Sequence, residues 1–377
     1  MSDERSWYKT YTWVLAGLIL TVYAMTVAKT LLLPMLFALL FSILLAPICD
    51  WLERFRVPRV FSTALVILGV GLIIGGLLFL FYRQILLFTE DLDMMERRLR
   101  ELIGSLEGGV SSWFGPGWIG EFDSLEDRLF SLLRDNLASL TQGLAGAASV
   151  VTSAFLIPVY LFLILMFRNF LQEFLLQLVG RGNDVRLQRA TRIFTRVGEV
   201  VQYYIVGVGL VILILATLYS SMLWLLGVRH AIFFGVFAGM LNIIPFIGPL
   251  FGSILPILYA LVTMDSWIYP IIIIAGFYLV QLLEGNLLTP VIVGSRVSMN
   301  ALVTLVLLLI GAKIWGLAGM ILFIPLGAIL KVVFDEIESL QPFGFLLGRV
   351  PSEMQSSKGP LARRINLLGR SVRDSDS

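Results

Sequence analysis

The sequence has very little of what builds covalent or metal-held sites. It contains one cysteine, Cys49, which excludes an intramolecular disulfide, and one histidine, His230, which argues against a zinc or iron site. It has no GxxxxGK phosphate loop, so ATP is not an evident energy source. Charged residues make up 14% of the chain, against about 25% in soluble domains, and the net charge is only +2. We therefore expect no cofactor, no metal and no nucleic-acid partner.

What the chain has in abundance is apolar sequence. Hydrophobic residues make up 58% of it and the mean hydropathy is +0.90, which indicates a protein solvated by lipid. The apolar runs predict an all-α polytopic membrane protein with about eight membrane-embedded helical units, two of them broken or re-entrant. The first two runs, Tyr11–Ala28 and Leu31–Ile48, are separated by almost no loop, which predicts a tight helical hairpin. His230 follows Arg229 at a helix boundary, so we expect it at the membrane interface.

Residues 83–147 differ in kind from the predicted spans. Apolar residues recur every three or four positions from Phe88 to Leu106, which is typical of an amphipathic helix, and Gly108–Gly109 is expected to end it. A second amphipathic helix, capped by Asp123, is expected to follow, so we predict a small helical module outside the bilayer core. The predicted organisation is three N-terminal spans in 1–82, this module in 83–147, a fourth span with a basic helix in 148–200, a C-terminal core with broken helices in 201–340 and a polar tail in 341–377.

Lysine and arginine residues predict the orientation in the membrane. Three arginines lie between the second and third spans and six between residues 168 and 196, and the tail is basic. Short basic links remain on the cytoplasmic side, whereas long segments cross regardless of charge. We therefore expect a multi-pass protein of the bacterial inner membrane with both termini in the cytoplasm. The arginine-rich helix within 184–200 fits a solvated cytoplasmic face or binding to anionic headgroups.

Two apolar runs in the second half are too long for one span. As one helix, Ala231–Thr263 would extend about 50 Å, against a hydrocarbon core of about 30 Å. Pro245, Gly248 and Pro249 predict a break between Asn242 and Pro249. The second run, Ala301–Phe334, is interrupted between Gly311 and Pro325. Such pairs of interrupted segments point to a transport site, and each run could cross fully or turn back.

Polar residues lie near these breaks. Gln281 and Glu284 are three residues apart and share a helix face. Glu284 ends an apolar helix, where it could be a buried carboxylate that carries a proton or a helix-end carboxylate in headgroup water. The predicted substrate or ion pathway comprises Asn242, Pro245, Gly248, Pro249, Gln281, Glu284, Asn286, Pro290 and Pro325, with Glu284 as the proton carrier.

Three blocks resemble a known family. They are LNIIPFIGPLFG at 241–252, QLLEGNLLTP at 281–290, and GAKIWGLAG at 311–319 followed by FIP at 323–325. In this order they resemble the AI-2E family of bacterial permeases, over about residues 10 to 340. The resemblance implies eight-spanning inner-membrane proteins that form homo-oligomers, with pentamers described. It also implies export of autoinducer-2 in some members and sodium or lithium/proton antiport in others. Asn300 departs from the pattern, since proline is common at that position.

The leading hypothesis is a secondary transporter that exports a small polar solute such as autoinducer-2. A sodium (lithium)/proton antiporter is the alternative within transport, with a monovalent cation as the partner. A membrane scaffold that recruits a partner through residues 83–147 is the alternative from another class. An intramembrane enzyme using Glu284 or Asp265 would need a second catalytic group at useful spacing in the apolar runs, which the sequence does not offer. We therefore expect no enzymatic activity.

Overall fold

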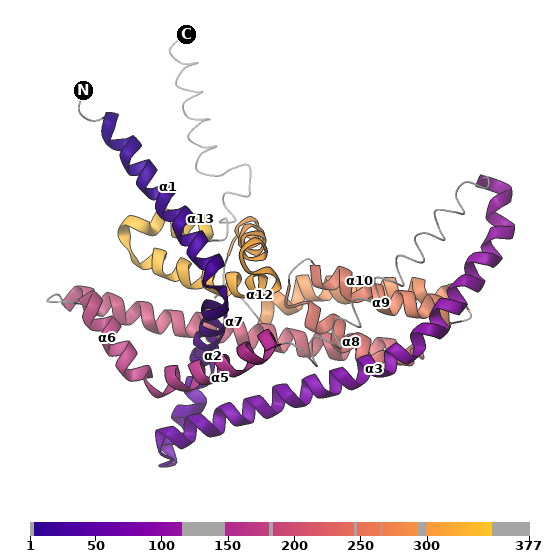
Figure 1. Ribbon diagram of the computed structural model, residues 1–377, viewed down its shortest axis with the longest axis horizontal. Helices are drawn as coiled ribbons and strands as arrows, with labels where there is room; N and C mark the ends of the chain where they lie inside the picture. Colours follow the sequence, from indigo (N-terminus) through magenta and orange to yellow (C-terminus); the bar gives the residue numbers. More distant parts are fainter. Residues whose placement is uncertain are drawn as a thin grey trace, which may run out of the picture. The chain divides into compact units, whose positions relative to one another are not determined.

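The computed structural model describes residues 4–114, 148–180, 184–244, 247–264, 266–292 and 299–348, which are almost entirely helical (Figure 1). This confirms the all-α polytopic class. The helices are α1 (Glu4–Val27), α2 (Lys29–Arg54), α3 (Arg59–Phe114), α5 (Ala148–Met166), α6 (Arg168–Gly180), α7 (Asp184–Leu225), α8 (Ala231–Leu241), α9 (Ile247–Thr263), α10 (Ile268–Leu283), the π-helix η1 (Glu284–Leu288), α11 (Thr289–Ile292), α12 (Ala301–Glu336), the short 3-10 helix η3 (Glu338–Leu340) and α13 (Gln341–Leu347).

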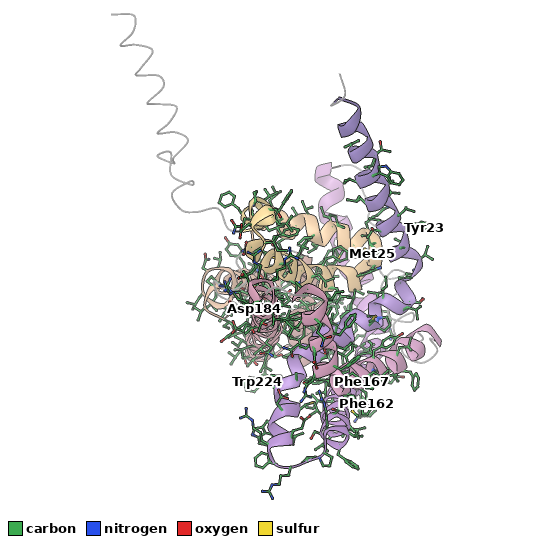
Figure 2. The ribbon with its side chains drawn as sticks, turned by 90° about the vertical axis from the view of Figure 1, so that its left-hand side faces the viewer. Tyr23, Met25, Phe162, Phe167, Asp184 and Trp224 are labelled. Atoms are coloured by element: carbon green, nitrogen blue, oxygen red, sulfur yellow. The ribbon has the colours of Figure 1, made fainter. Side chains whose placement is uncertain are left out.

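Within the described residues, five helices are long and apolar enough to cross a membrane. They are α2, the first half of α3, α7, the segment Ile268–Ile292 and α12, and the pair α5 and α6, bent by 67° at Phe167, could supply a sixth. Large apolar side chains project from the outer surface, as Tyr23 and Trp224 do in Figure 2. A surface of this kind is stable in lipid and would aggregate in water.

The junction between α1 and α2 is not the predicted hairpin. The amide of Ala28 donates to the carbonyl of Ala24, and the amide of Leu32 donates to the carbonyl of Ala28. Helical hydrogen bonding therefore runs through the junction, and α2 continues onward from α1 with a bend in both Figure 1 and Figure 2. The prediction failed because a missing loop permits a continued helix as readily as a reversal.

Helix α3 corrects the expectation that Gly108–Gly109 ends a helix. It is 56 residues long and runs through residue 83 and through Gly108–Gly109 without a break. Glycine lowers helix propensity by about 1 kcal/mol but does not by itself end a helix. The buried residues Ile85, Phe88 and Met95 pack in one cluster with residues of α8 and α9. The expected second helix of the module, capped by Asp123, lies outside the described residues.

The chain divides into two compact units, each described here by itself. The first contains Met1–Leu175 and Gln202–Gly294. In it, α2, α3 and α5 form one cluster around Ala38, Val66 and Leu165. At the edge of this cluster Arg168 forms ion pairs with Asp50 and Glu53 of α2. These pairs hold α2 at the bend between α5 and α6.

The second cluster of this unit is aromatic and encloses the one histidine. Phe88 of α3 contacts Phe233 and Phe234 of α8, at ring-centroid distances of 5.8 and 5.6 Å. His230 is 8% exposed and lies edge-on to Phe88 and to Tyr259 of α9. Aromatic rings from three helices therefore close over His230, which is buried within the protein.

The second unit contains Leu176–Val201 and Ser295–Ser377. Glu336, whose side chain is 8% exposed, pairs with Arg196 at 2.5 Å and with Arg192 at 3.8 Å. Arg189 pairs with Glu338 at 2.8 Å. The basic face of α7 thus binds the end of α12 and η3, so these arginines are not simply a solvated surface. At the other end of α12, the Asn300 side chain accepts the Leu302 amide, which is the N-cap role that favours asparagine.

The first interrupted run is a helical hairpin of α8 and α9. A Cβ atom on Gly248 would lie 2.1 Å from the Leu241 carbonyl oxygen, and one on Gly252 would lie 2.9 Å from the Cα atom of Ala238. The second pair, Gly252 and Ala238, is further from the turn on both helices than the first pair, Gly248 and Leu241. The two helices are therefore antiparallel. With 11 residues, α8 is about 16 Å long and too short to cross the hydrocarbon core. The structure therefore favours a run that turns back.

The second interrupted run, α12, is also a hairpin. Gly316 has φ 63° and ψ −140°, a backbone conformation that side-chain-bearing residues rarely adopt, and the chain reverses there. Gly311 and Gly319 then face each other, since a Cβ atom on Gly319 would lie 2.0 Å from the Gly311 carbonyl oxygen. Pro325 is buried inside the returning helix. The break is therefore at Gly316 alone, and Pro325 is not part of it.

Candidate functional site

The Glu284 carboxylate, in the first unit, accepts three side-chain hydrogen bonds. Asn242 Nδ2 donates to Oε1 at 3.0 Å, Gln281 Nε2 donates to Oε2 at 2.6 Å, and Thr289 Oγ1 donates to Oε1 at 3.3 Å. Glu284 is half-buried. A carboxylate in an apolar surrounding is tolerated when donors replace the water it loses, and here protein groups do so. We call these four residues the Glu284 cluster.

The cluster is assembled from two elements distant in sequence. Asn242 is the C-cap residue of α8, at the tip of the α8–α9 hairpin. Gln281, Glu284 and Thr289 belong to one continuous helical segment, Ile268–Ile292. The bond between Asn242 and Glu284 therefore ties the hairpin tip to α10 and η1.

The turn that follows α10 is a π-helix, Glu284–Leu288. Turns of this type are rare, and they occur frequently at functional sites. The wider π turn brings residues five apart onto one face, which allows the Thr289 hydroxyl to reach Glu284. The helix that the sequence predicts to end at Glu284 thus continues through η1 and α11 to Ile292.

Gln281 carries an unmet acceptor. Its Nε2 donates to Glu284, but its Oε1 is buried without a hydrogen-bond partner. A buried amide oxygen that lacks a donor costs about 1–3 kcal/mol. Such an atom leaves the cluster one acceptor that a further donor can satisfy.

The structure distributes the other predicted residues as follows. Asn286 is exposed, and its side-chain amide donates to the Leu282 carbonyl at 2.8 Å, so it does not enter the cluster. Pro290 is exposed in α11. Gly248 and Pro249 lie in the first turn of α9. Backbone N–H groups in a first turn have no acceptor within the helix, so the missing N–H of proline is tolerated there. Pro325 lies in the second unit, and Pro245 lies outside the described residues.

Sequence reasoning missed Thr289. In an α-helix, residues five apart point in different directions, so the spacing from Glu284 to Thr289 gave no signal. Only the π turn aligns them. The available hint was the run Glu-Gly-Asn, which combines a charge, a glycine and an asparagine within an apolar helix.

Thr289→Val tests the contribution of this hydroxyl. We expect a loss of about 1 kcal/mol in unfolding free energy. The substitution removes one of the three donors to the carboxylate, and the hydrogen bond that it removes is long, at 3.3 Å. Transport should fall several-fold, and circular dichroism should report an intact fold. Thr217→Val is the matched control, because the Thr217 hydroxyl donates only to the Leu213 carbonyl of its own helix. Equal effects of the two substitutions would contradict a role for Thr289 in the cluster.

The cluster offers little to a metal ion. Among the described residues, no group of three or more His, Cys, Asp and Glu side chains is placed to hold one. Amide and hydroxyl donors with one carboxylate and one open amide oxygen are suited to hydrogen bonding with an uncharged polar molecule.

Comparison with known proteins gives matches over nearly the whole chain. A family model described as "AI-2E family transporter" matches residues 14–339. The AI-2 transport protein TqsA of Escherichia coli (strain K12) is 27% identical over 346 residues, which cover 90% of this chain and 96% of that protein. YueF of Bacillus subtilis (strain 168), named provisionally as a transport protein, is 28% identical over 327 residues, which cover 83% of this chain and 85% of YueF. YrrI of the same organism, named in the same way, is 25% identical over 321 residues, which cover 81% and 86%.

Proposed function

The chain belongs to the AI-2E transporter family, and on that premise we propose that it is a permease for a small, uncharged, hydroxyl-rich solute, with autoinducer-2 as the candidate. The family is one of transport proteins, and the chain is a multi-pass bacterial membrane protein of permease type. The substrate name comes from the relative TqsA. Export and the substrate itself are the parts of this proposal that go beyond family membership.

The observation that carries the proposal is the buried Oε1 atom of Gln281, which has no hydrogen-bond partner and lies beside the Glu284 carboxylate. A hydroxyl group both donates and accepts, so a polyol can donate to Gln281 and accept from Asn242 at once. This is the chemistry that a hydroxyl-rich signal molecule presents.

The same geometry suggests how binding is coupled to movement. Asn242 holds the hairpin tip to η1 through a single hydrogen bond to Glu284. A solute hydroxyl that competes for this bond releases the tip from α10, and the hairpin can then shift. A ligand moves such an equilibrium only through its different affinity for the two states, and here the difference is the exchanged hydrogen bond.

Antiport has less support. A sodium or lithium site is built from several oxygen ligands, and the cluster has a single carboxylate that three side chains already occupy. A scaffold without transport would not need a hydrogen-bonded carboxylate or an open amide oxygen at membrane depth. We also expect an inner-membrane location, cytoplasmic termini and a homo-oligomer, from the basic links and the family resemblance.

Purified protein in liposomes tests the function. We expect labelled autoinducer-2, loaded inside, to leave the vesicles faster than from protein-free liposomes, with unlabelled solute competing. Sodium-dependent proton movement, measured with a pH-sensitive dye, should be absent. Proton movement without solute efflux would establish the antiporter instead, and neither flux from well-inserted protein would favour a scaffold.

A further inference from the structure

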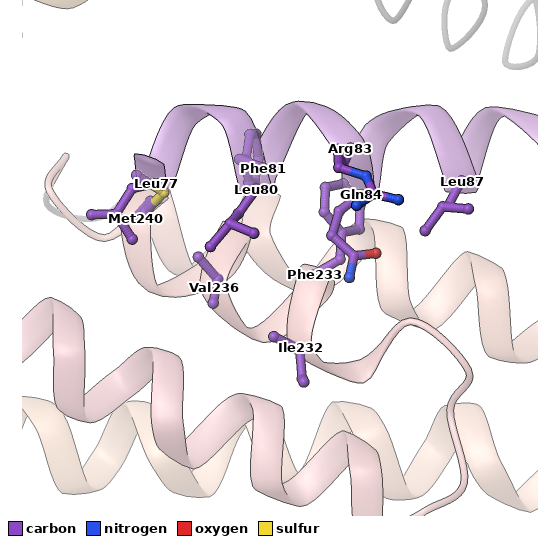
Figure 3. A pocket seen from close by; sticks show the side chains of 10 residues that line it. All are labelled: Leu77, Leu80, Phe81, Arg83, Gln84, Leu87, Ile232, Phe233, Val236 and Met240. Carbon is purple, nitrogen blue, oxygen red and sulfur yellow. The ribbon is translucent and has the colours of Figure 1, made fainter. Parts of the chain in front are cut away.

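A groove of about 320 Å³ lies between α3 and α8, and none of the four residues of the Glu284 cluster lines it (Figure 3). Phe81 and Phe233 stack at 5.3 Å between the two helices, so the groove rests on the aromatic core of the first unit. Apolar side chains form the walls: Leu77, Leu80 and Leu87 of α3 and Ile232 and Met240 of α8 are exposed, and Val236 of α8 is half-buried. From Leu77 to Leu87 the groove follows α3 for about 15 Å.

The lining contains two polar side chains, Arg83 and Gln84. The Arg83 side chain is exposed, and no carboxylate of the described residues lies within ion-pair distance of it. Gln84 Oε1 is buried and has no hydrogen-bond partner. The groove thus pairs an available cation with an unmet acceptor, next to an otherwise apolar channel.

The position of Arg83 along α3 indicates its depth in the membrane. Arg59 is the first residue of α3, and Arg83 lies about 36 Å further along the helix. The hydrocarbon core is about 30 Å thick, so the two arginines reach opposite headgroup layers. All side chains from residue 71 to residue 80 are exposed, which leaves this stretch of α3 facing acyl chains.

We propose that the groove between α3 and α8 is a binding site for one phosphatidylglycerol molecule from the surrounding leaflet. Its phosphate pairs with Arg83, a hydroxyl of its glycerol headgroup donates to Gln84 Oε1 as the amide turns toward the groove, and one acyl chain lies along Leu80 and Val236. An anionic lipid satisfies the charge, and its hydroxyls satisfy the acceptor. The headgroup of phosphatidylcholine has no hydroxyl or N–H group to donate to Gln84, and its quaternary ammonium group is repelled by Arg83. The site therefore discriminates against this lipid.

Native mass spectrometry of the full-length protein, titrated with phosphatidylglycerol or phosphatidylcholine, tests the site. We expect one tightly held phosphatidylglycerol per chain, and Arg83→Gln should weaken it about tenfold because the charge-assisted bonds to phosphate are lost. Val236→Trp should fill the groove and displace either lipid. Arg97→Gln is the matched control, because Arg97 is also exposed on α3 but does not line the groove.

Each outcome decides the matter. Selective weakening by Arg83→Gln, with Arg97→Gln like the wild type, supports the site even if Val236→Trp does not fold. Equal weakening by the two arginine substitutions would show only general attraction to anionic lipid and would overturn the proposal. A changed subunit number in Val236→Trp with unchanged lipid retention would show that another copy of the chain covers the groove, and would also overturn it.

Discussion

Glu284→Gln is expected to lower transport at least about a hundredfold while the protein still inserts in the membrane. Three donors point at the Glu284 carboxylate, and glutamine offers them one acceptor oxygen and one NH2 group. A donor therefore faces a donor on one side of the new side chain. A hydrogen bond to a charged group contributes about 1.5–3 kcal/mol, so the loss of one bond, together with the loss of the charge from the other two, corresponds to about two orders of magnitude.

The measurement is efflux of labelled solute from liposomes, with inserted protein quantified. Glu199→Gln is the matched control, because Glu199 is exposed on α7 and lies outside the cluster. The same variant tests the proposed proton carrier, since Glu284→Gln should remove any pH dependence of the flux. Transport within twofold of the wild type would exclude Glu284 from the pathway.

Gly248→Ala is expected to separate the α8–α9 hairpin at its tip. The added Cβ atom would lie 2.1 Å from the Leu241 carbonyl oxygen and 2.6 Å from the Asn242 Cα atom. Both are backbone atoms, so no change of rotamer relieves the clash. We expect a loss of about 2–4 kcal/mol in unfolding free energy, and loss of transport because Asn242 moves away from Glu284.

Thermal unfolding in detergent and solute efflux measure the two effects. Gly209→Ala on α7 is the control, since no heavy atom lies within 4 Å of its added Cβ and alanine favours a helix by about 1 kcal/mol. If Gly248→Ala unfolded at the same temperature as Gly209→Ala, the tight contact between the two helices would be disproved.

Local sequence predicted some residues of the Glu284 cluster and not others. Gln281 and Glu284 were placed on one face from their spacing alone, and the structure joins them at 2.6 Å. Asn242 was named for its position beside a break, but nothing local pairs it with a residue 42 positions away. Thr289 was missed because its alignment with Glu284 depends on a π turn.

The interrupted runs show the same division. Their excess length and their glycine and proline residues predicted that each would break. The position of the second break, at Gly316 and not near Pro325, depended on which glycine adopts a positive φ once Gly311 and Gly319 pack together.

Sequence alone determined that this chain is a helical membrane protein, that two of its apolar runs are broken and that its family transports solutes. These properties follow from composition and from patterns within a few helical turns, where geometry is nearly constant. Only the tertiary structure decided that the broken runs are hairpins, that α3 continues beyond the predicted span and that Asn242 and Thr289 meet Glu284. Those features depend on which surfaces pack together, and packing is chosen by the shape of distant residues.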